Sequence, residues 1–264
     1  MNMIGVVGGV GPFAGLDLTK KIFTQTLAAS DQEHLPVALL SVPGRIADRT
    51  EYLLGRVQTN PAYAVSHIIL QLEKIGATVV GIPCNTMHAP RIFGVIQENL
   101  EKQGSKVLLL NMISEVTSFI ATEFQGLDKI GILSTTGTWQ TGIYARVLEE
   151  NGLIPVSPLQ KAQQQVHAAI YDASYGIKAH SYPVKQKAKY QLINGIHHLK
   201  DRGAQGIILG CTEIAYALPY NILEDLPLFD PTAILARSLI ARSYPEKLRT
   251  LKESGFDFDA ISGK

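Results

Sequence analysis

Cysteine is scarce in this sequence, with 2 residues among 264. Two thiols cannot form the disulfide framework of a small secreted domain, and neither lies in a C-x-x-C motif, so we expect no structural metal site. No apolar run approaches the ~20 residues that span a bilayer, and the apolar start before Gly8 is too short for a signal peptide. We therefore expect a cytoplasmic protein that contacts neither metal nor membrane.

An excess of charge of either sign is also missing. The 24 Lys and Arg residues balance 23 Asp and Glu residues, and hydrophobic residues make up 46% of the chain. A net charge of +1 does not indicate binding to nucleic acid or to an anionic membrane. The composition is that of an ordinary globular protein, and the length suits one large domain or two smaller ones.

The two cysteines occupy matching positions in two similar segments. Residues 76–84 and 203–211 each begin with Gly-Ala and continue as an apolar run to a Cys eight positions after the Gly (84 − 76 = 8; 211 − 203 = 8). Each pattern predicts a buried strand that delivers a thiol to the edge of a sheet. A lone Cys there is usually a small core hydrophobe, and a disulfide is disfavoured inside cells. The matched pair instead favours one symmetric reaction.

A second correspondence extends this duplication. The strand and turn from Met3 to Gly11 match those from Lys129 to Thr138 at an offset of 126 residues (130 − 4 = 126), against 127 for the cysteines (211 − 84 = 127). Strand and helix patterns alternate, which predicts α/β architecture with parallel sheets. We expect two similar domains related by a pseudo-two-fold axis, with the active site in the cleft between them. The predicted domains are 1–114, completed by 217–264, and 115–216.

Polar residues and glycines follow the predicted strands of the first half. The turn from Gly8 to Pro12 presents backbone N–H groups suited to an anion, but it lacks the dinucleotide fingerprint, so a carboxylate is the better ligand. The strand from Val37 to Val42 leads into a loop that contains Arg49. This Arg either grips a carboxylate through a bidentate fork or is a solvated surface residue.

The surroundings of the two thiols predict acid/base chemistry. Small polar residues and then a predicted helix follow each Cys, and the partial positive charge of a helix N-terminus favours thiolate. One thiolate and one thiol can remove a proton from one face of a carbon and return a proton to the other. The resulting carbanion needs preorganised donors, which Asn85, Thr86 and Thr212 can supply. No lysine motif for pyridoxal phosphate stands out, so we expect no cofactor.

Four motifs carry a family resemblance: Gly8 to Pro12, Asp48 to Thr50, Pro83 to His88 and Leu209 to Ile214. Together they resemble the aspartate/glutamate racemase family, its aspartate racemase branch in particular. The resemblance implies a cofactor-independent, metal-free, commonly dimeric racemase whose two bases are Cys84 and Cys211. It also implies that Arg49 and a lysine of the second half bind the substrate carboxylates.

We assign that lysine to Lys178, in a stretch that departs from the usual family wording. Glu213 stands where glutamate racemases carry a histidine, which favours aspartate or broad specificity. His88 and His180 are interpreted as structural residues.

The predicted function is therefore an amino-acid racemase that interconverts L- and D-aspartate, with glutamate as a further substrate. One alternative is a broad-specificity amino-acid or hydantoin racemase, and another is a binding protein without turnover, which would need neither Cys. The predicted partners are a small amino-acid substrate and a second copy of the chain. The predicted catalytic residues are Cys84 and Cys211, and the predicted substrate-binding residues are Gly9, Asp48, Arg49, Thr50, Asn85, Thr86, Thr135, Thr136, Lys178 and Thr212.

Overall fold

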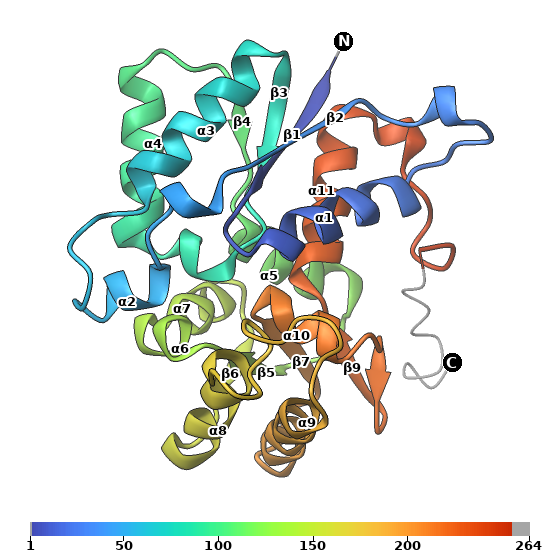
Figure 1. The fold of residues 1–264 in the computed structure, drawn as a ribbon. Coiled ribbons are helices and arrows are strands. Elements are labelled where there is room, and N and C mark those ends of the chain that lie inside the picture. Colours follow the sequence, from blue (N-terminus) through green and yellow to red (C-terminus); the bar gives the residue numbers. More distant parts are fainter. Residues whose placement is uncertain (1, 255–264) are drawn as a thin grey trace. The chain divides into compact units, whose positions relative to one another are not determined.

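A computed structural model describes residues 2–254, which form two compact units (Figure 1). Unit 1 comprises residues 2–115 and 232–254, and unit 2 comprises residues 116–231. The helix α5 (Met112–Glu123) runs across the boundary between them. The chain thus returns to unit 1 at Thr232, later than position 217 expected from the sequence.

Unit 1 contains a parallel sheet of four strands in the order β2-β1-β3-β4. The strands are β1 (Met3–Gly8), β2 (Val37–Ser41), β3 (Ala77–Gly81) and β4 (Leu108–Leu109). The two central strands, β1 and β3, are almost fully buried. Both faces of the central part of a parallel sheet are covered by helices, which explains their continuous apolar sequence.

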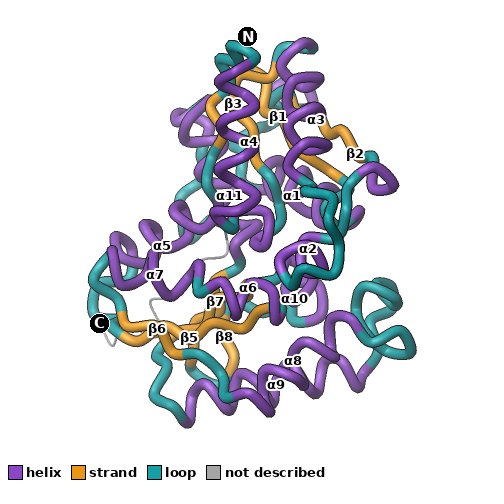
Figure 2. Tube along the Cα trace, turned by 90° about the vertical axis from the view of Figure 1, so that its left-hand side faces the viewer, coloured by secondary structure: helices purple, strands orange, loops and turns teal. Residues whose placement is uncertain are grey.

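Helices cover both faces of this sheet. Unit 1 contains α1 (Pro12–Thr24), α2 (Arg49–Leu53), α3 (Ala62–Lys74), α4 (Pro90–Lys102) and α11 (Pro231–Ser243), with the short helices η1 (Asp31–Glu33), η2 (Pro43–Arg45), η3 (Asn85–His88) and η4 (Pro245–Lys247). α3 and α4 lie side by side and share a core with Val80 of β3 (Figure 2). The next residue, Gly81, faces Leu235 and Leu239 of α11. Successive strand residues point to opposite faces, so α11 covers the other side.

Unit 2 repeats this topology. Its sheet has the order β6-β5-β7-β9-β8, and its strands are β5 (Lys129–Ser134), β6 (Ile154–Val156), β7 (Gly206–Gly210), β8 (Ile222–Leu223) and β9 (Leu226–Phe229). All neighbours are parallel except β8 and β9. With β6, β5, β7 and β9 in the places of β2, β1, β3 and β4, the predicted duplication is present. Because β9 pairs with β7, residues 217–231 complete the sheet of unit 2.

The helices of unit 2 are α6 (Thr136–Thr141), α7 (Ile143–Glu150), α8 (Gln160–Tyr171), α9 (Gln186–Asp201) and α10 (Thr212–Ala217). α8 and α9 lie side by side and form a core with Leu133 and Ile207 of the sheet (Figure 2). The sequence from Gln140 to Asn151 predicts a single helix, and the structure contradicts this prediction. Gly142 has a φ of +58° and breaks the helix there, while the helical turn begins earlier, at Thr136.

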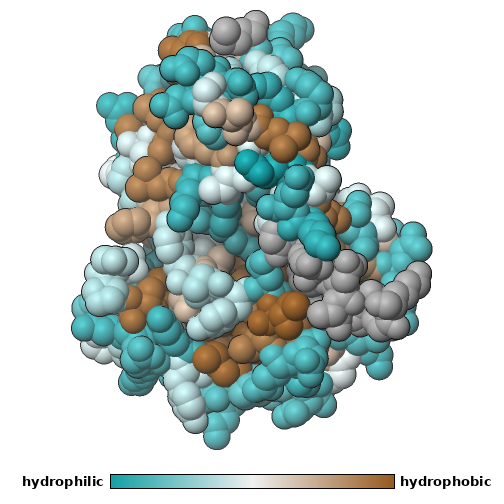
Figure 3. Space-filling view, turned by 90° about the vertical axis from the view of Figure 1, so that its right-hand side faces the viewer, coloured by the Kyte–Doolittle hydropathy of each residue, from teal (hydrophilic) through white to brown (hydrophobic). Residues whose placement is uncertain are grey.

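Exposed hydrophobic side chains include Phe13 and Leu16 of α1 in unit 1, and Tyr182 and Tyr190 in unit 2. On the face shown in Figure 3, apolar groups alternate with hydrophilic side chains. Among the described helices, none has both the length and the apolar content needed to cross a bilayer.

Candidate active site

Three loops of unit 1 follow the carboxyl ends of neighbouring parallel strands. The register pairs Gly8 of β1 with Ser41 of β2, and Val6 of β1 with Gly81 of β3. The segments that follow these strands therefore leave the sheet at one edge, where parallel α/β sheets bind their ligands. This brings the predicted residues of unit 1 together: Gly9, Asp48, Arg49, Thr50, Cys84, Asn85 and Thr86.

Gly9 allows two of these loops to pack closely together because it has no side chain. Its φ is +79°, and a Cβ atom there would lie 2.8 Å from the backbone nitrogen of Pro43. A side chain would thus meet both a strained backbone conformation and a steric clash. The turn after β1 can therefore pack directly on the loop after β2.

Arg49 is buried at the first position of α2, with 8% of its surface exposed. Its Nη2 donates to the carbonyl oxygen of Val10 at 3.0 Å. Asp48 caps the helix, because its carboxylate accepts the backbone N–H of Glu51 at 2.9 Å. Thr50 is also buried. Arg49 is thus a buried cation at the strand ends rather than a solvated surface residue.

Cys84 lies beyond the end of β3 and just before η3. The side chains of Cys84, Asn85 and Thr86 are all buried. The Nδ1–H of His88 donates to the Cys84 carbonyl at 3.0 Å, and the His88 ring packs on Phe93 with centroids 4.9 Å apart. Burial lowers the pKa of His88 to about 4, so the ring is neutral. A neutral His88 therefore supports the Cys84 backbone, consistent with the structural role expected for it.

In unit 2 the turn after β5 is built by threonines and by α8. The Thr135 hydroxyl accepts the backbone N–H of Thr138 at 3.3 Å and caps α6. The backbone N–H of Thr136 donates to Nδ1 of His167 at 3.3 Å. Gln163, also buried, donates from Nε2 to the Ser134 carbonyl at 2.9 Å. Two side chains of α8 thus hold the turn that contains the predicted residues Thr135 and Thr136.

Cys211, Glu213 and Lys178 form one connected group in unit 2. The Cys211 thiol donates to Oε2 of Glu213 at 2.9 Å, and the Thr212 hydroxyl donates to the same oxygen at 3.2 Å. The other oxygen, Oε1, pairs with the Lys178 ammonium. Glu213 therefore links the predicted catalytic thiol to the predicted substrate-binding lysine.

Electrostatics place the proton of this group on sulfur. Burial raises the pKa of Cys211 well above its ordinary value, and the Glu213 charge raises it further, while Lys178 acts in the opposite direction. Burial also acts to raise the pKa of Glu213, but Lys178 and the hydrogen bonds bring it down to about 2. At Cys211, burial and the Glu213 charge therefore outweigh the partial positive charge of the helix N-terminus, which favours thiolate.

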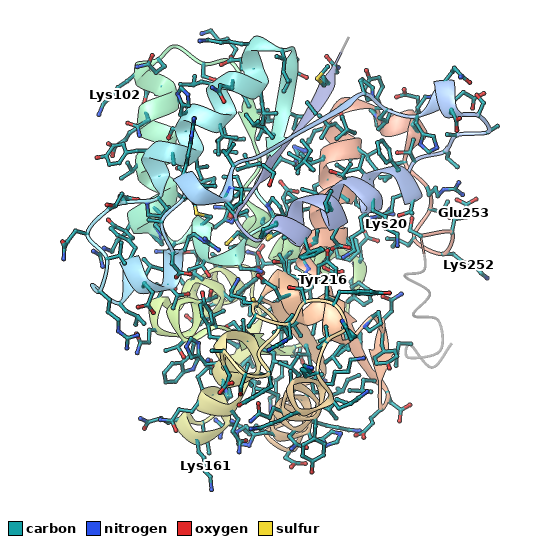
Figure 4. The ribbon with its side chains drawn as sticks, in the orientation of Figure 1. Lys20, Lys102, Lys161, Tyr216, Lys252 and Glu253 are labelled. Atoms are coloured by element: carbon teal, nitrogen blue, oxygen red, sulfur yellow. The ribbon has the colours of Figure 1, made fainter. Side chains whose placement is uncertain are left out.

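Lys178 is held by the turn that follows α8. Its backbone N–H donates to the Ile170 carbonyl at 3.0 Å, and its ammonium lies 5.4 Å from the centroid of the Tyr171 ring. The ring of Tyr171 in turn stacks on His167, with centroids 4.8 Å apart. By contrast, Lys161 at the start of α8 is exposed and projects away from unit 2 (Figure 4).

The sequence analysis missed three residues that build this part of the site: Gln163, His167 and Tyr171. They recur at intervals of four, which places them on one face of α8. That spacing was visible in the sequence, but it does not say which loop the face meets. Among the described residues, no group of three or more His, Cys, Asp or Glu side chains is arranged to hold a metal ion.

The fold and site define a duplicated α/β protein in which a buried thiol follows the equivalent strand of each unit. The sequence model of the family described as Asp/Glu/Hydantoin racemase matches residues 7–239. The chain belongs to this family.

Individual relatives agree with this assignment. The chain is 27% identical over 247 residues to the broad specificity amino-acid racemase RacX of Bacillus subtilis, covering 90% of this chain and 97% of the relative. The aspartate racemase of Picrophilus torridus superposes with a TM-score of 0.75 at 25% identity, covering 97% of this chain and 100% of that one. The glutamate racemase of Francisella tularensis, solved with D-glutamate, shares the fold with a TM-score of 0.62 at 17% identity, covering 94% and 83% of the respective chains.

Proposed function

We propose that this protein is an amino-acid racemase that moves protons with two thiols, Cys84 and Cys211. The observation that carries the proposal is their equivalence. Each thiol follows the strand that pairs with the first strand of its unit, β3 beside β1 and β7 beside β5. Membership of a racemase family supports a shared chemical role for these two positions rather than a packing role.

In the proposed reaction, one thiolate removes the α-proton from one face of the substrate carbon. The Cα–H bond breaks as an S–H bond forms, and the other thiol donates its proton to the opposite face. The electron pair of the carbanion takes up that proton, so the configuration inverts and the donor becomes a thiolate. The proposed chemistry requires both thiols to reach the same carbon.

The carbanion must be stabilised beside the substrate carboxylate. Backbone N–H groups of the turns after β1 and β5, together with the hydroxyls of Thr86 and Thr135, are the proposed donors. These groups are buried or lie at tightly built turns, so little reorganisation accompanies charge development. Asn85 is assigned to the same role beside Cys84.

Aspartate is the substrate that we propose first. Arg49 is a buried guanidinium at the strand ends, suited to a second carboxylate, and the structural neighbour from P. torridus is an aspartate racemase. A broad substrate range is the second candidate. It is favoured by the Lys178 ammonium, which already pairs with Glu213, and by the broad-specificity relative from B. subtilis.

A chiral chromatography screen tests the proposal. Both enantiomers of each common amino acid are incubated with the parent protein, Cys84→Ala and Cys211→Ala. We expect racemisation by the parent alone, because each thiol serves one face of the substrate. A metal chelator should not affect the parent's activity. Full racemisation by either variant would exclude the two-thiol reaction. An aspartate kcat/KM about thirtyfold or more above that of alanine or serine supports aspartate specificity, whereas comparable values support a broad range.

A further inference from the structure

Glu213 contacts both the predicted catalytic thiol of Cys211 and the predicted substrate-binding ammonium of Lys178. Its side chain lies within the first turn of α10, and only 8% of the residue is exposed. One carboxylate oxygen accepts hydrogen bonds from Cys211 and Thr212, while the other pairs with Lys178. A carboxylate can only accept hydrogen bonds, so the proton between Glu213 and Cys211 belongs to the thiol.

We propose that Glu213 is a positioning residue that keeps a proton on Cys211 in the resting protein, so that Cys211 starts the turnover as the acid and Cys84 as the base. This inference rests on the proposed two-thiol reaction. Among the described residues, the charged groups that act on Cys211 are Glu213 in α10 and Lys178 after α8. Lys178 in turn faces the ring of Tyr171.

The electrostatic effects on the pKa values support this arrangement. Lys178 keeps Glu213 ionised, because it offsets the cost of burying the carboxylate. The ionised Glu213 and the buried position of Cys211 both disfavour a second negative charge on sulfur. Once Cys211 has donated its proton, its thiolate lies beside a carboxylate, so the form with a protonated Cys211 is restored preferentially.

The preference for a protonated Cys211 affects the kinetics of the two enantiomers, but the racemisation equilibrium limits which constants can differ. The two enantiomers are equally stable in solution, so kcat/KM must be the same in both directions. The preference for protonated Cys211 therefore appears in kcat and KM taken separately. The enantiomer whose α-proton faces Cys84 reacts with the resting form, whereas the other enantiomer requires the proton-exchanged form.

The test measures the thiol directly and needs no substrate. Replacing Cys84 with Ser leaves Cys211 as the single thiol of a chain that has two. In this background, thiolate absorbance is titrated for the parent and for Glu213→Gln. Loss of the carboxylate should lower the apparent pKa of Cys211 by about one unit or more, because Lys178 is then the nearby charge. Glu224→Gln is the control, since Glu224 pairs with His197 and Lys200 instead.

Alkylation by iodoacetamide provides a second measurement. A pKa lower by one unit raises the thiolate fraction about tenfold, but nucleophilicity falls with pKa, so the rate at a pH below both pKa values should rise about threefold. Glu213→Asp retains the charge near Lys178 and withdraws it from sulfur by one methylene. It should give an intermediate pKa, and it provides the test if Glu213→Gln does not fold.

An unchanged Cys211 pKa in the Gln variant, or in the Asp variant if only that one folds, would overturn the inference. The proposed function is tested separately by the racemisation screen. A protein that racemises but shows no pKa change overturns the role of Glu213 alone. A protein that shows the pKa change but does not racemise overturns the proposed function, and with it the assignment of Cys211 as the acid.

Discussion

Arg49 donates from Nη2 to the carbonyl oxygen of Val10 at 3.0 Å, which joins the loop after β2 to the turn after β1. The guanidinium is planar, so a hydrogen bond on one nitrogen fixes the direction of the others. A lysine at this position would keep the charge but lose this fixed geometry. Arg49 is therefore suited both to holding the two loops together and to orienting a carboxylate.

Replacing Arg49 tests which substrate group it binds. We expect Arg49→Lys to lower kcat/KM for aspartate strongly, with Arg49→Ala costing about 2 to 5 kcal/mol in transition-state binding, as for one partner of a desolvated charge pair. Alanine and serine should lose no more than a few-fold. Steady-state kinetics with each substrate provide the measurement. An equal loss for all substrates would instead assign Arg49 to the α-carboxylate.

Gly9→Ala should destabilise the protein, by about 1 to 3 kcal/mol. Alanine would have to adopt a φ of +79°, and its methyl group would lie only 2.8 Å from the backbone nitrogen of Pro43. Gly44→Ala is a matched control from the facing loop, because its Cβ would meet nothing within 4 Å. Urea denaturation of the two variants measures the difference. Equal stabilities would show that the loop after β2 can move away from Gly9 at little cost.

The fold was predictable to a large extent because its main signals are local. Buried parallel strands have continuous apolar sequences, and Gly76 and Gly203, which precede the two Cys strands, both have positive φ values that glycine adopts without strain. The apolar pattern from Lys106 to Asn111 predicts a strand over that whole range, but β4 covers only Leu108–Leu109, at the edge of the sheet. An edge strand pairs on one side only, so its length depends on a single neighbour.

The sequence indicated candidate site residues but not the contacts between them. Lys178 and Glu213 are 35 positions apart, and no local pattern indicates that they pair. For the same reason the sequence did not indicate which of the two cysteines is the thiol. The sequence indicates the six-residue helix after Cys211, whose electric field is weak. Burial of the thiol and its contact with the carboxylate of Glu213 depend on tertiary packing, which the sequence does not show.

His88 predicts a pH dependence of stability. Its pKa is about 4 in the folded chain against 6.5 for the free side chain, so the unfolded chain binds the proton more tightly. The contribution of neutral His88 to the free energy of unfolding is fully present above about pH 6.5. It is lost as the pH falls toward about 4, at up to ~1.4 kcal/mol per pH unit. His88→Asn cannot titrate, so its stability should fall less between about pH 7 and about pH 5.

Urea denaturation at the two pH values measures this difference, and His67→Asn is the control because His67 is exposed and contacts Gln71. The prediction fails if the His88 variant loses as much stability as the parent over this interval.

Lys178 should contribute to stability and to the recognition of acidic substrates, and the two effects can be separated. Lys178→Met leaves the buried carboxylate of Glu213 without its ammonium, which should cost up to about 3 kcal/mol of unfolding free energy, less than a fully buried pair because Lys178 is partly exposed. Lys161→Met, on the exposed side of α8, should change stability by no more than about 0.5 kcal/mol. Chemical denaturation measures both.

The double variant Lys178→Met/Glu213→Gln removes both charges of the pair. It should recover most of the lost stability, since no buried charge is then left unpaired. If the Lys178 ammonium also binds the distal carboxylate of aspartate, kcat/KM for aspartate relative to alanine stays low in the single and the double variant alike. If Lys178 serves only to balance Glu213, that ratio returns to the parent value in the double variant. The ratio cancels any loss of catalytic power common to both substrates, so it isolates the contribution of Lys178 to substrate choice.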